Sequence, residues 1–205
     1  MMVPMNNRKD VEMTFITNRH LNLTGIVVAL LLSTAVSSSA AVIRDVEFAD
    51  TVRIGQEELS LRGVAVLRWA MLFDVYAGAF YLQEGRSGQA WAEDLAKRLE
   101  LSYFREIKSS DFTDTSIKLL KHNLPEPEYR GLAERLQTFC LLFQNVKPGD
   151  HYTLTYTPGN GTELSLNNQP LGSVPGSDFA AAYFGLWLGK NPINVAFRDR
   201  LLSGP

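Results

Sequence analysis

The stretch RGVAVLRWAMLFDVYAGAFYL, residues 62–82, is rich in branched and aromatic side chains and holds one aspartate and two glycines. Branched and aromatic residues favour β-strands. We therefore expect extended chain here, although helical spacing also fits Phe73, Tyr76 and Phe80. A tyrosine in the middle of so apolar a segment either packs in a core or faces a pocket.

Side-chain alternation predicts which residues would face such a pocket together with Tyr76. In one extended strand over residues 68–82, Arg68, Asp74 and Tyr76 would share a face, because successive side chains point to opposite sides. Gly78 would lie on that face too and leave room beside Tyr76. The alternative is that Arg68 pairs with Asp74, or with a surface carboxylate, while Tyr76 is a core residue.

The composition of the chain describes an ordinary soluble domain. Its 205 residues are 45% apolar and 20% charged, which suits one globular domain with a real core. The net charge of −2 does not indicate binding to nucleic acid or to an anionic membrane surface. The single cysteine, Cys140, excludes an internal disulfide, and its apolar surroundings indicate a buried small side chain. The chain has only three histidines in addition to this cysteine, so we expect no metal site and no cofactor.

The beginning of the chain has the parts of a secretory signal. Residues 24–36 form an apolar run that is preceded by basic residues and followed by SSSAA. The run is short of the roughly 20 residues that a membrane span takes. Ser38 and Ala40 suit a cleavage site, so we expect a signal peptide at residues 1–40 and a domain at residues 41–205. The domain is then periplasmic or otherwise exported, with no membrane span after cleavage; an uncleaved anchor is the alternative.

Patterns along the domain predict strands, then helices, a hairpin and further helices. Strands are expected at residues 42–54, 58–63, 64–82, 98–107, 151–157 and 162–167. Helices are expected at residues 88–97, 110–123, 128–143 and 179–189, followed by a short helix, with Ser109 or Ser110 as a cap. This order indicates an α+β fold: a mainly antiparallel sheet with helices on one face.

Two segments together are more specific than any short motif. They are residues 62–82 and the segment LFQNVKPGDHYTLTYTPGNGTELSLNNQPLGSVPGSDFAAAYFGLWLG, residues 142–189. Their order and spacing resemble the bacterial, exported chalcone isomerase-like family of the wider chalcone isomerase superfamily. The resemblance extends over essentially all of residues 41–205. It implies an open-faced β-sandwich, in which a curved antiparallel sheet carries helices layered on one face with a cleft between them.

The resemblance also implies where a plant-type isomerase would carry its polar groups. The strand threonine of the plant enzymes falls at Tyr76, their tyrosine and asparagine fall near Phe112 and Leu119, and their late hydroxyl falls near Leu186. Three of these four positions are apolar here. The chain contains no GxGxxG, P-loop, HExxH or GxSxG motif either. Whether it is an enzyme stays open, and the resemblance leans towards no.

The superfamily's non-catalytic members hold a fatty acid with an arginine and a tyrosine. The resemblance therefore implies a ligand site with Arg68, or Arg62 as the other candidate, and Tyr76, while Tyr103 and Tyr183 line the same cleft. Arginine grips a carboxylate through two hydrogen bonds. We expect an exported, non-catalytic binder of a small amphipathic ligand such as a fatty acid or other carboxylate. The alternatives are an isomerase with an unknown substrate and a periplasmic protein-interaction module.

Overall fold

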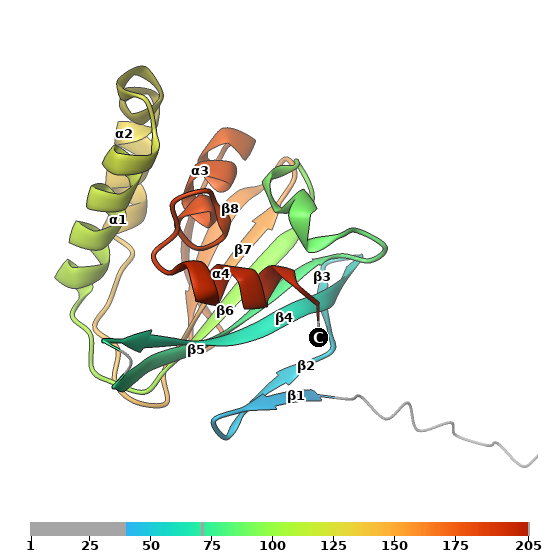
Figure 1. Ribbon diagram of the computed structural model, residues 1–205. Coiled ribbons are helices and arrows are strands. Elements are labelled where there is room, and N and C mark those ends of the chain that lie inside the picture. The colour runs from blue at the N-terminus through green and yellow to red at the C-terminus, as the bar shows by residue number, and fades with distance from the viewer. Residues whose placement is uncertain (1–39, 71, 205) are drawn as a thin grey trace, which may run out of the picture. The chain divides into compact units, whose positions relative to one another are not determined.

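The fold is built on a seven-stranded antiparallel sheet. The computed structural model describes residues 40–70 and 72–204, so the expected signal peptide, apart from Ala40, lies outside the described residues. The strands follow one another in chain order across the sheet (Figure 1). They are β3 (Thr51–Ile54), β4 (Glu57–Trp69), β5 (Phe73–Gln83), β6 (Lys97–Tyr103), β7 (His151–Thr157), β8 (Gly161–Leu166) and β9 (Gln169–Val174).

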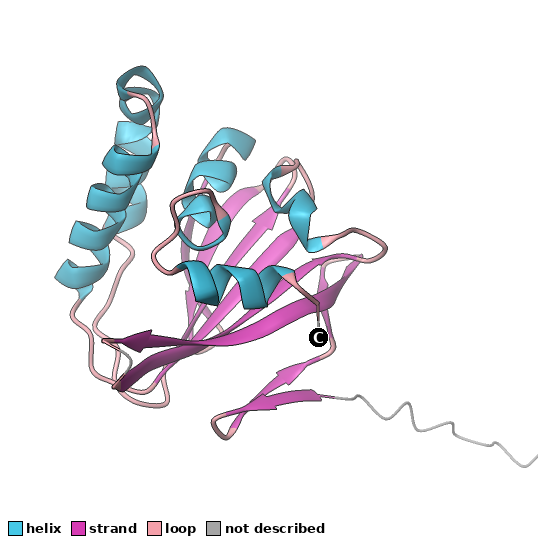
Figure 2. Cartoon of the chain, in the orientation of Figure 1, coloured by secondary structure: helices cyan, strands magenta, loops and turns pink. Residues whose placement is uncertain are grey.

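Helices cover one face of this sheet, and a small hairpin packs against the other. The helices are α1 (Ser109–Asn123), α2 (Glu126–Cys140), α3 (Ser177–Leu188) and α4 (Val195–Leu202), with a short 3₁₀ helix, η1 (Gly88–Ala92). The hairpin consists of β1 (Ala40–Ile43) and β2 (Val46–Ala49) (Figure 2). Within the described residues, no helix is long and apolar enough to cross a membrane. The predicted α+β fold, a curved antiparallel sheet with helices on one face, is confirmed.

The period of two in the strands divides the core into two clusters. Phe80, Leu99 and Leu154 belong to the larger cluster, which the helices cover. The smaller cluster lies on the other face, where Tyr81 packs with Phe48 of the small hairpin. All members of both clusters lie between residues 41 and 202, within one compact unit of the chain, so we use residues 40–205 as the domain in the experiments below.

The expected single strand over residues 68–82 is wrong, because the chain turns back within it. β4 ends at Trp69 and β5 begins at Phe73, and the two strands pair with Arg68 opposite Asp74. Ala70 lies in the turn with a φ of 49°, a region that side chains other than glycine seldom adopt. Arg68 and Tyr76 therefore come from different strands. Residues 58–63 and 64–69 both belong to β4, so the strand predicted at residues 58–63 runs on into the next one, with a shift in its register against β5 between Leu61 and Gly63.

The predicted strand at residues 42–54 also divides. Arg44 and Asp45 have φ values of 53° and 63° and form the tight turn between β1 and β2. Residues 51–54 then leave this hairpin and pair with β4 in the main sheet. The segment was expected to be extended, and it is, but as three short strands in two sheets.

The helix predicted at residues 88–97 is reduced to η1. The ammonium group of Lys97 donates hydrogen bonds to the carbonyl oxygens of Trp91 at 2.7 Å and Glu93 at 2.6 Å. These carbonyls are therefore occupied and do not continue a helical ladder. Lys97 is almost fully buried, and this burial lowers the pKa of its side chain to about 8. A contact with the next strand thus overrides local helix propensity.

The other predicted helices are confirmed with shifted ends. α1 starts at Ser109, so neither Ser109 nor Ser110 caps it; the carboxylate of Asp111 instead accepts the backbone N–H of Lys108 at 3.3 Å. α2 starts two residues before the predicted position and has Pro127 in its first turn, where a missing N–H costs little.

Two glycines allow α4 to lie directly on β4 and β5. A Cβ atom at Gly63 would be 2.2 Å from the carbonyl oxygen of Arg200, and one at Gly78 would be 2.6 Å from the ring of Phe197. The room that Gly78 leaves is filled by this ring, which meets the ring of Tyr76 edge-on with centroids 5.5 Å apart. The side chain of Phe197 on α4 consequently packs against one side of Tyr76.

We predict that Gly63→Ala lowers the free energy of unfolding by about 1–3 kcal/mol, since the added methyl group pushes α4 away from the sheet. Urea unfolding of residues 40–205 measures this. Gly131→Ala is the matched control: nothing lies within 4 Å of its Cβ position in α2. In that helix the same substitution is expected to stabilise by about 0.5–1 kcal/mol. Equal effects at the two positions would contradict the close approach of α4.

Candidate functional site

An apolar cavity of about 210 Å³ lies between the sheet and the helices α1 and α3. Strands β4 to β8 supply its floor, and the two helices with three connecting segments supply its walls. Its lining consists of Leu67, Val75, Tyr76, Leu99, Leu101, Tyr103, Ile107, Asp111, Phe112, Thr115, Ser116, Leu119, Phe143, Tyr152, Leu154, Leu164, Tyr183, Leu186, Trp187 and Ile193. The three tyrosines expected at a ligand site are brought together in this wall.

Tyr76 joins the floor of the cavity to α3. It is 5% exposed, and its hydroxyl accepts a hydrogen bond from the indole N–H of Trp187 at 3.0 Å. Its ring meets that of Tyr103 edge-on at 5.5 Å between centroids. Burial raises the pKa of the Tyr76 hydroxyl well above its ordinary value, and the bond from Trp187 acts in the opposite direction. Tyr76 therefore stays a neutral phenol.

Tyr183 and Tyr103 differ in how their hydroxyls are satisfied. The hydroxyl of Tyr183 shares a hydrogen bond of 2.8 Å with that of Ser116 on α1. Among the described residues, no side chain or backbone group forms a hydrogen bond with the hydroxyl of Tyr103. Burial raises the pKa of both groups. Tyr103 thus offers a neutral, unused hydroxyl to a ligand.

Arg68 lies outside the cavity wall. Its guanidinium Nε is 2.9 Å from one carboxylate oxygen of Asp74, and the Nε of Arg44 is 2.9 Å from the other. The reason is the hairpin, which sets Arg68 opposite Asp74 near the sheet's end. Arg62, the other candidate, donates to the carbonyl oxygen of Gln83 at 3.3 Å and does not line the cavity either.

Sequence reasoning missed part of the wall. Trp187 was not among the predicted site residues, yet it lines the cavity and donates a hydrogen bond to Tyr76. Its spacing of four from Tyr183 on one helix was the available signal. Tyr152 also lines the cavity, but its hydroxyl is fully used, because it accepts the N–H of Gln144 at 2.7 Å and donates to the carbonyl of the same residue at 2.8 Å.

Four positions at which the resemblance places polar groups of the plant isomerases lie in this wall. Tyr76, Phe112, Leu119 and Leu186 line the cavity, whereas the two candidates for the plant enzymes' arginine do not. Among the described residues, Asp111 is the one charged side chain of the lining. The wall offers hydroxyl groups and apolar surface, but no cation that would stabilise an oxyanion.

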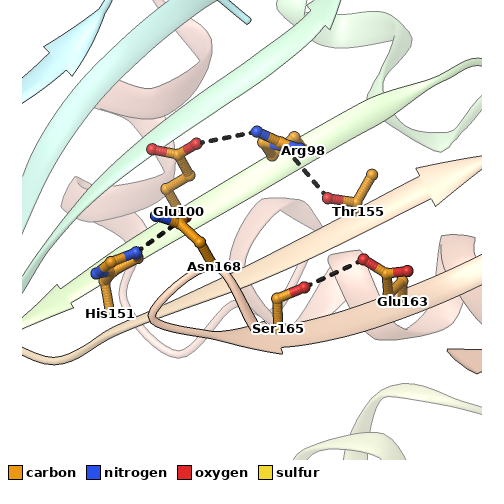
Figure 3. Close-up of polar contacts among 7 residues, drawn as sticks. All are labelled: Arg98, Glu100, His151, Thr155, Glu163, Ser165 and Asn168. Carbon is orange, nitrogen blue, oxygen red and sulfur yellow. Dashed lines mark hydrogen bonds and ion pairs between the residues drawn. The ribbon is translucent and has the colours of Figure 1, made fainter. Parts of the chain in front are cut away.

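The opposite face of the sheet carries a separate set of polar side chains on β6, β7 and β8 (Figure 3). Arg98 lies 3.5 Å from Glu100 and donates to Thr155 at 3.2 Å. Ser165 donates to Glu163 at 3.1 Å, and a ring nitrogen of His151 lies 3.3 Å from the amide oxygen of Asn168. Partial burial raises the pKa of Glu100. These groups pair with one another, so the face is a hydrogen-bonded polar surface.

The family of the chain follows from a match over nearly the whole described region. The family model for chalcone isomerase-like proteins matches residues 40–203, and the chain therefore belongs to the chalcone isomerase-like family. The crystal structure of a fatty-acid binding protein of Arabidopsis thaliana is similar to it, with a TM-score of 0.61 and 18% sequence identity. The similarity covers 80% of this chain and 96% of that one, and it shows a common fold. A search of curated protein sequences gives no match.

The buried tyrosines predict alkaline unfolding. A tyrosine whose pKa is higher in the folded state stabilises fully below the unfolded pKa of about 10, and loses this effect as the pH rises through the folded value. The free energy of unfolding should therefore fall above about pH 10, by roughly 1.4 kcal/mol per pH unit for each such tyrosine. Urea unfolding across this pH range measures the slope of the free energy of unfolding against pH. In Tyr103→Phe this slope should be smaller by the contribution of one tyrosine, because one proton fewer is released on unfolding. An identical slope in both proteins would show that Tyr103 titrates alike in both states.

Proposed function

We propose that this protein binds a small amphipathic carboxylate, such as a fatty acid, and does not transform it. The observation that carries the proposal is the apolar cavity, whose polar lining atoms are mostly neutral hydroxyl groups. The fatty-acid binding protein with the same fold supports it. Binding is favoured over isomerisation because the described wall lacks the cation that an enolate or oxyanion needs.

The size of the cavity limits the part of the ligand that it encloses. An apolar cavity of about 150 Å³ is enough for benzene. The 210 Å³ here therefore accommodates one aromatic ring or a short acyl chain, and a longer chain extends through the mouth. Apolar surface that enters the cavity contributes roughly 25 cal/mol per Å². The unused hydroxyl of Tyr103 is a hydrogen-bond partner for a polar atom within the chain or ring.

The carboxylate is proposed to lie at the mouth. Five lining residues of the cavity, among them Val75 and Asp111, also line an adjoining surface cleft that contains Arg68 and Arg105. Among the described residues, these two arginines are the cations that line the cleft. Asp111 lies on the same mouth and repels an anion, so the head group is placed on the side of the two arginines.

Titration of residues 40–205 with straight-chain carboxylates of increasing length tests this function. The affinity is expected to rise about fourfold for each methylene group that enters the cavity, and to level off once the cavity is filled. Isothermal titration calorimetry measures it. If no length of chain binds, the proposed function is wrong.

Substitutions then locate the head group. Arg68→Ala and Arg105→Ala should each weaken binding of the carboxylate about tenfold, while the primary alcohol of equal length binds as before. Arg53→Ala is the matched control, because Arg53 is also exposed and ion-paired but lies on β3. An unchanged affinity of the Arg68→Ala variant for the carboxylate would show that Arg68 does not belong to the site.

We also propose that the protein is exported, with residues 1–40 as a cleaved signal peptide. The support is the sequence of that segment, a basic start followed by a short apolar run and small residues. N-terminal sequencing of the protein recovered from the periplasm of an expression host is expected to begin at Ala41. A protein retained with its full N-terminus in the membrane fraction would favour the uncleaved anchor.

A further inference from the structure

The turn between β4 and β5 exposes three large apolar side chains. Trp69 is 67%, Leu72 is 77% and Phe73 is 48% exposed. Figure 1 shows the end of β4 and the start of β5 side by side at one end of the sheet. The rings of Trp69 and Phe73 stack with centroids 6.5 Å apart, so the three residues form one surface, which we call the tip patch. Exposed apolar groups clustered in this way mark interaction sites rather than ordinary surface.

Arginines lie beside the tip patch. The guanidinium of Arg105 lies 5.1 Å from the centroid of the Phe73 ring, and Arg68 precedes Trp69 in the chain and lines the same cleft. Arg68 also lines a second cleft, together with Arg44 and Arg200.

The ion pairs at this end of the sheet leave a positive charge in excess. Arg44 and Arg68 share one carboxylate, that of Asp74, so these three side chains together carry one positive charge. Arg105 lines the cleft at the mouth with Glu106 and Asp111.

The tip patch is continuous with the mouth of the apolar cavity. Trp69 lines the surface cleft at that mouth, together with Arg68 and Arg105. The same cleft shares Leu67 and Ile193, among others, with the cavity. A surface that contacts the tip patch therefore lies directly at the entrance.

We propose that the tip patch inserts into the headgroup region of an anionic lipid bilayer and holds the cavity mouth at the membrane surface. Tryptophan and phenylalanine favour this region, where apolar and wet surroundings meet. The flanking arginines reach lipid phosphates, which they bind through paired hydrogen bonds. An apolar ligand can then pass between bilayer and cavity without crossing water. Only this last step rests on the proposed function; the docking itself stands without it.

Flotation or sedimentation of residues 40–205 with lipid vesicles, in the absence of any ligand, tests the docking. We expect binding to vesicles of phosphatidylcholine with phosphatidylglycerol, weaker binding to phosphatidylcholine alone, and a loss with added salt. Each of three single substitutions should weaken vesicle binding about tenfold: Trp69→Ser, Leu72→Ser and Phe73→Ser. Leu141→Ser is the matched control, because Leu141 is 80% exposed but lines neither cleft.

Tryptophan quenching by brominated lipids gives a second readout. Quenching that is present in the wild-type domain and absent in Trp69→Phe would place the tip patch in the bilayer. The proposal is overturned if no vesicle binds the domain, or if Leu141→Ser and the tip variants lose binding equally. It is also overturned if the domain binds no vesicle but sediments as a dimer that Trp69→Ser dissociates, which would assign the tip patch to a second copy of the chain. The vesicle experiments contain no ligand, so their results can be interpreted even if no carboxylate binds in the titration.

Discussion

The hydrogen bond from the Trp187 indole to the Tyr76 hydroxyl is the contact on which the cavity depends. It joins the floor of the sheet to α3 across 3.0 Å, between residues 111 positions apart in the chain. Both groups are polar atoms in an apolar space, and each would be costly there without the other. Phe197 of α4 holds Tyr76 from a further side. Because these two polar groups satisfy one another, this part of the floor is apolar towards the cavity, while the hydroxyl of Tyr103 has no partner among the described residues.

The patterns that predicted the fold well are those that a single segment contains. The alternation in HYTLTYT places Tyr152 and Leu154 under the helices and the threonines on the other face. The apolar stripes of α1 and α2 likewise follow from spacing alone. The tyrosines of the cavity were candidates because of the family resemblance, and their places on buried strand and helix faces bring them to one wall.

What could not be predicted depends on contacts between distant segments or on missing signals. The turn after Trp69 contains none of the residues that usually mark a turn, and Ala70 adopts its unusual φ without glycine's freedom. Without that turn, Arg68 and Tyr76 seem to belong to one strand, and a guanidinium is assigned to a pocket that it does not enter. The short extent of η1 depends on Lys97 and the carbonyls it binds, which no local propensity describes.

The order of the strands has a consequence for how the domain forms. From β3 to β9, each strand pairs with the one before it in the chain, so none waits for a partner made later. A chain emerging from its N-terminal side can therefore add strands one at a time to a growing edge, with little entropy lost to closing long loops. The insertion of α1 and α2 between β6 and β7 is the longest interruption, and η1 lies between β5 and β6. Because α3 follows β9 in the chain, the sheet is made before the helix that supplies one wall of the cavity. The cavity is therefore enclosed only after α3 has been added to a finished sheet.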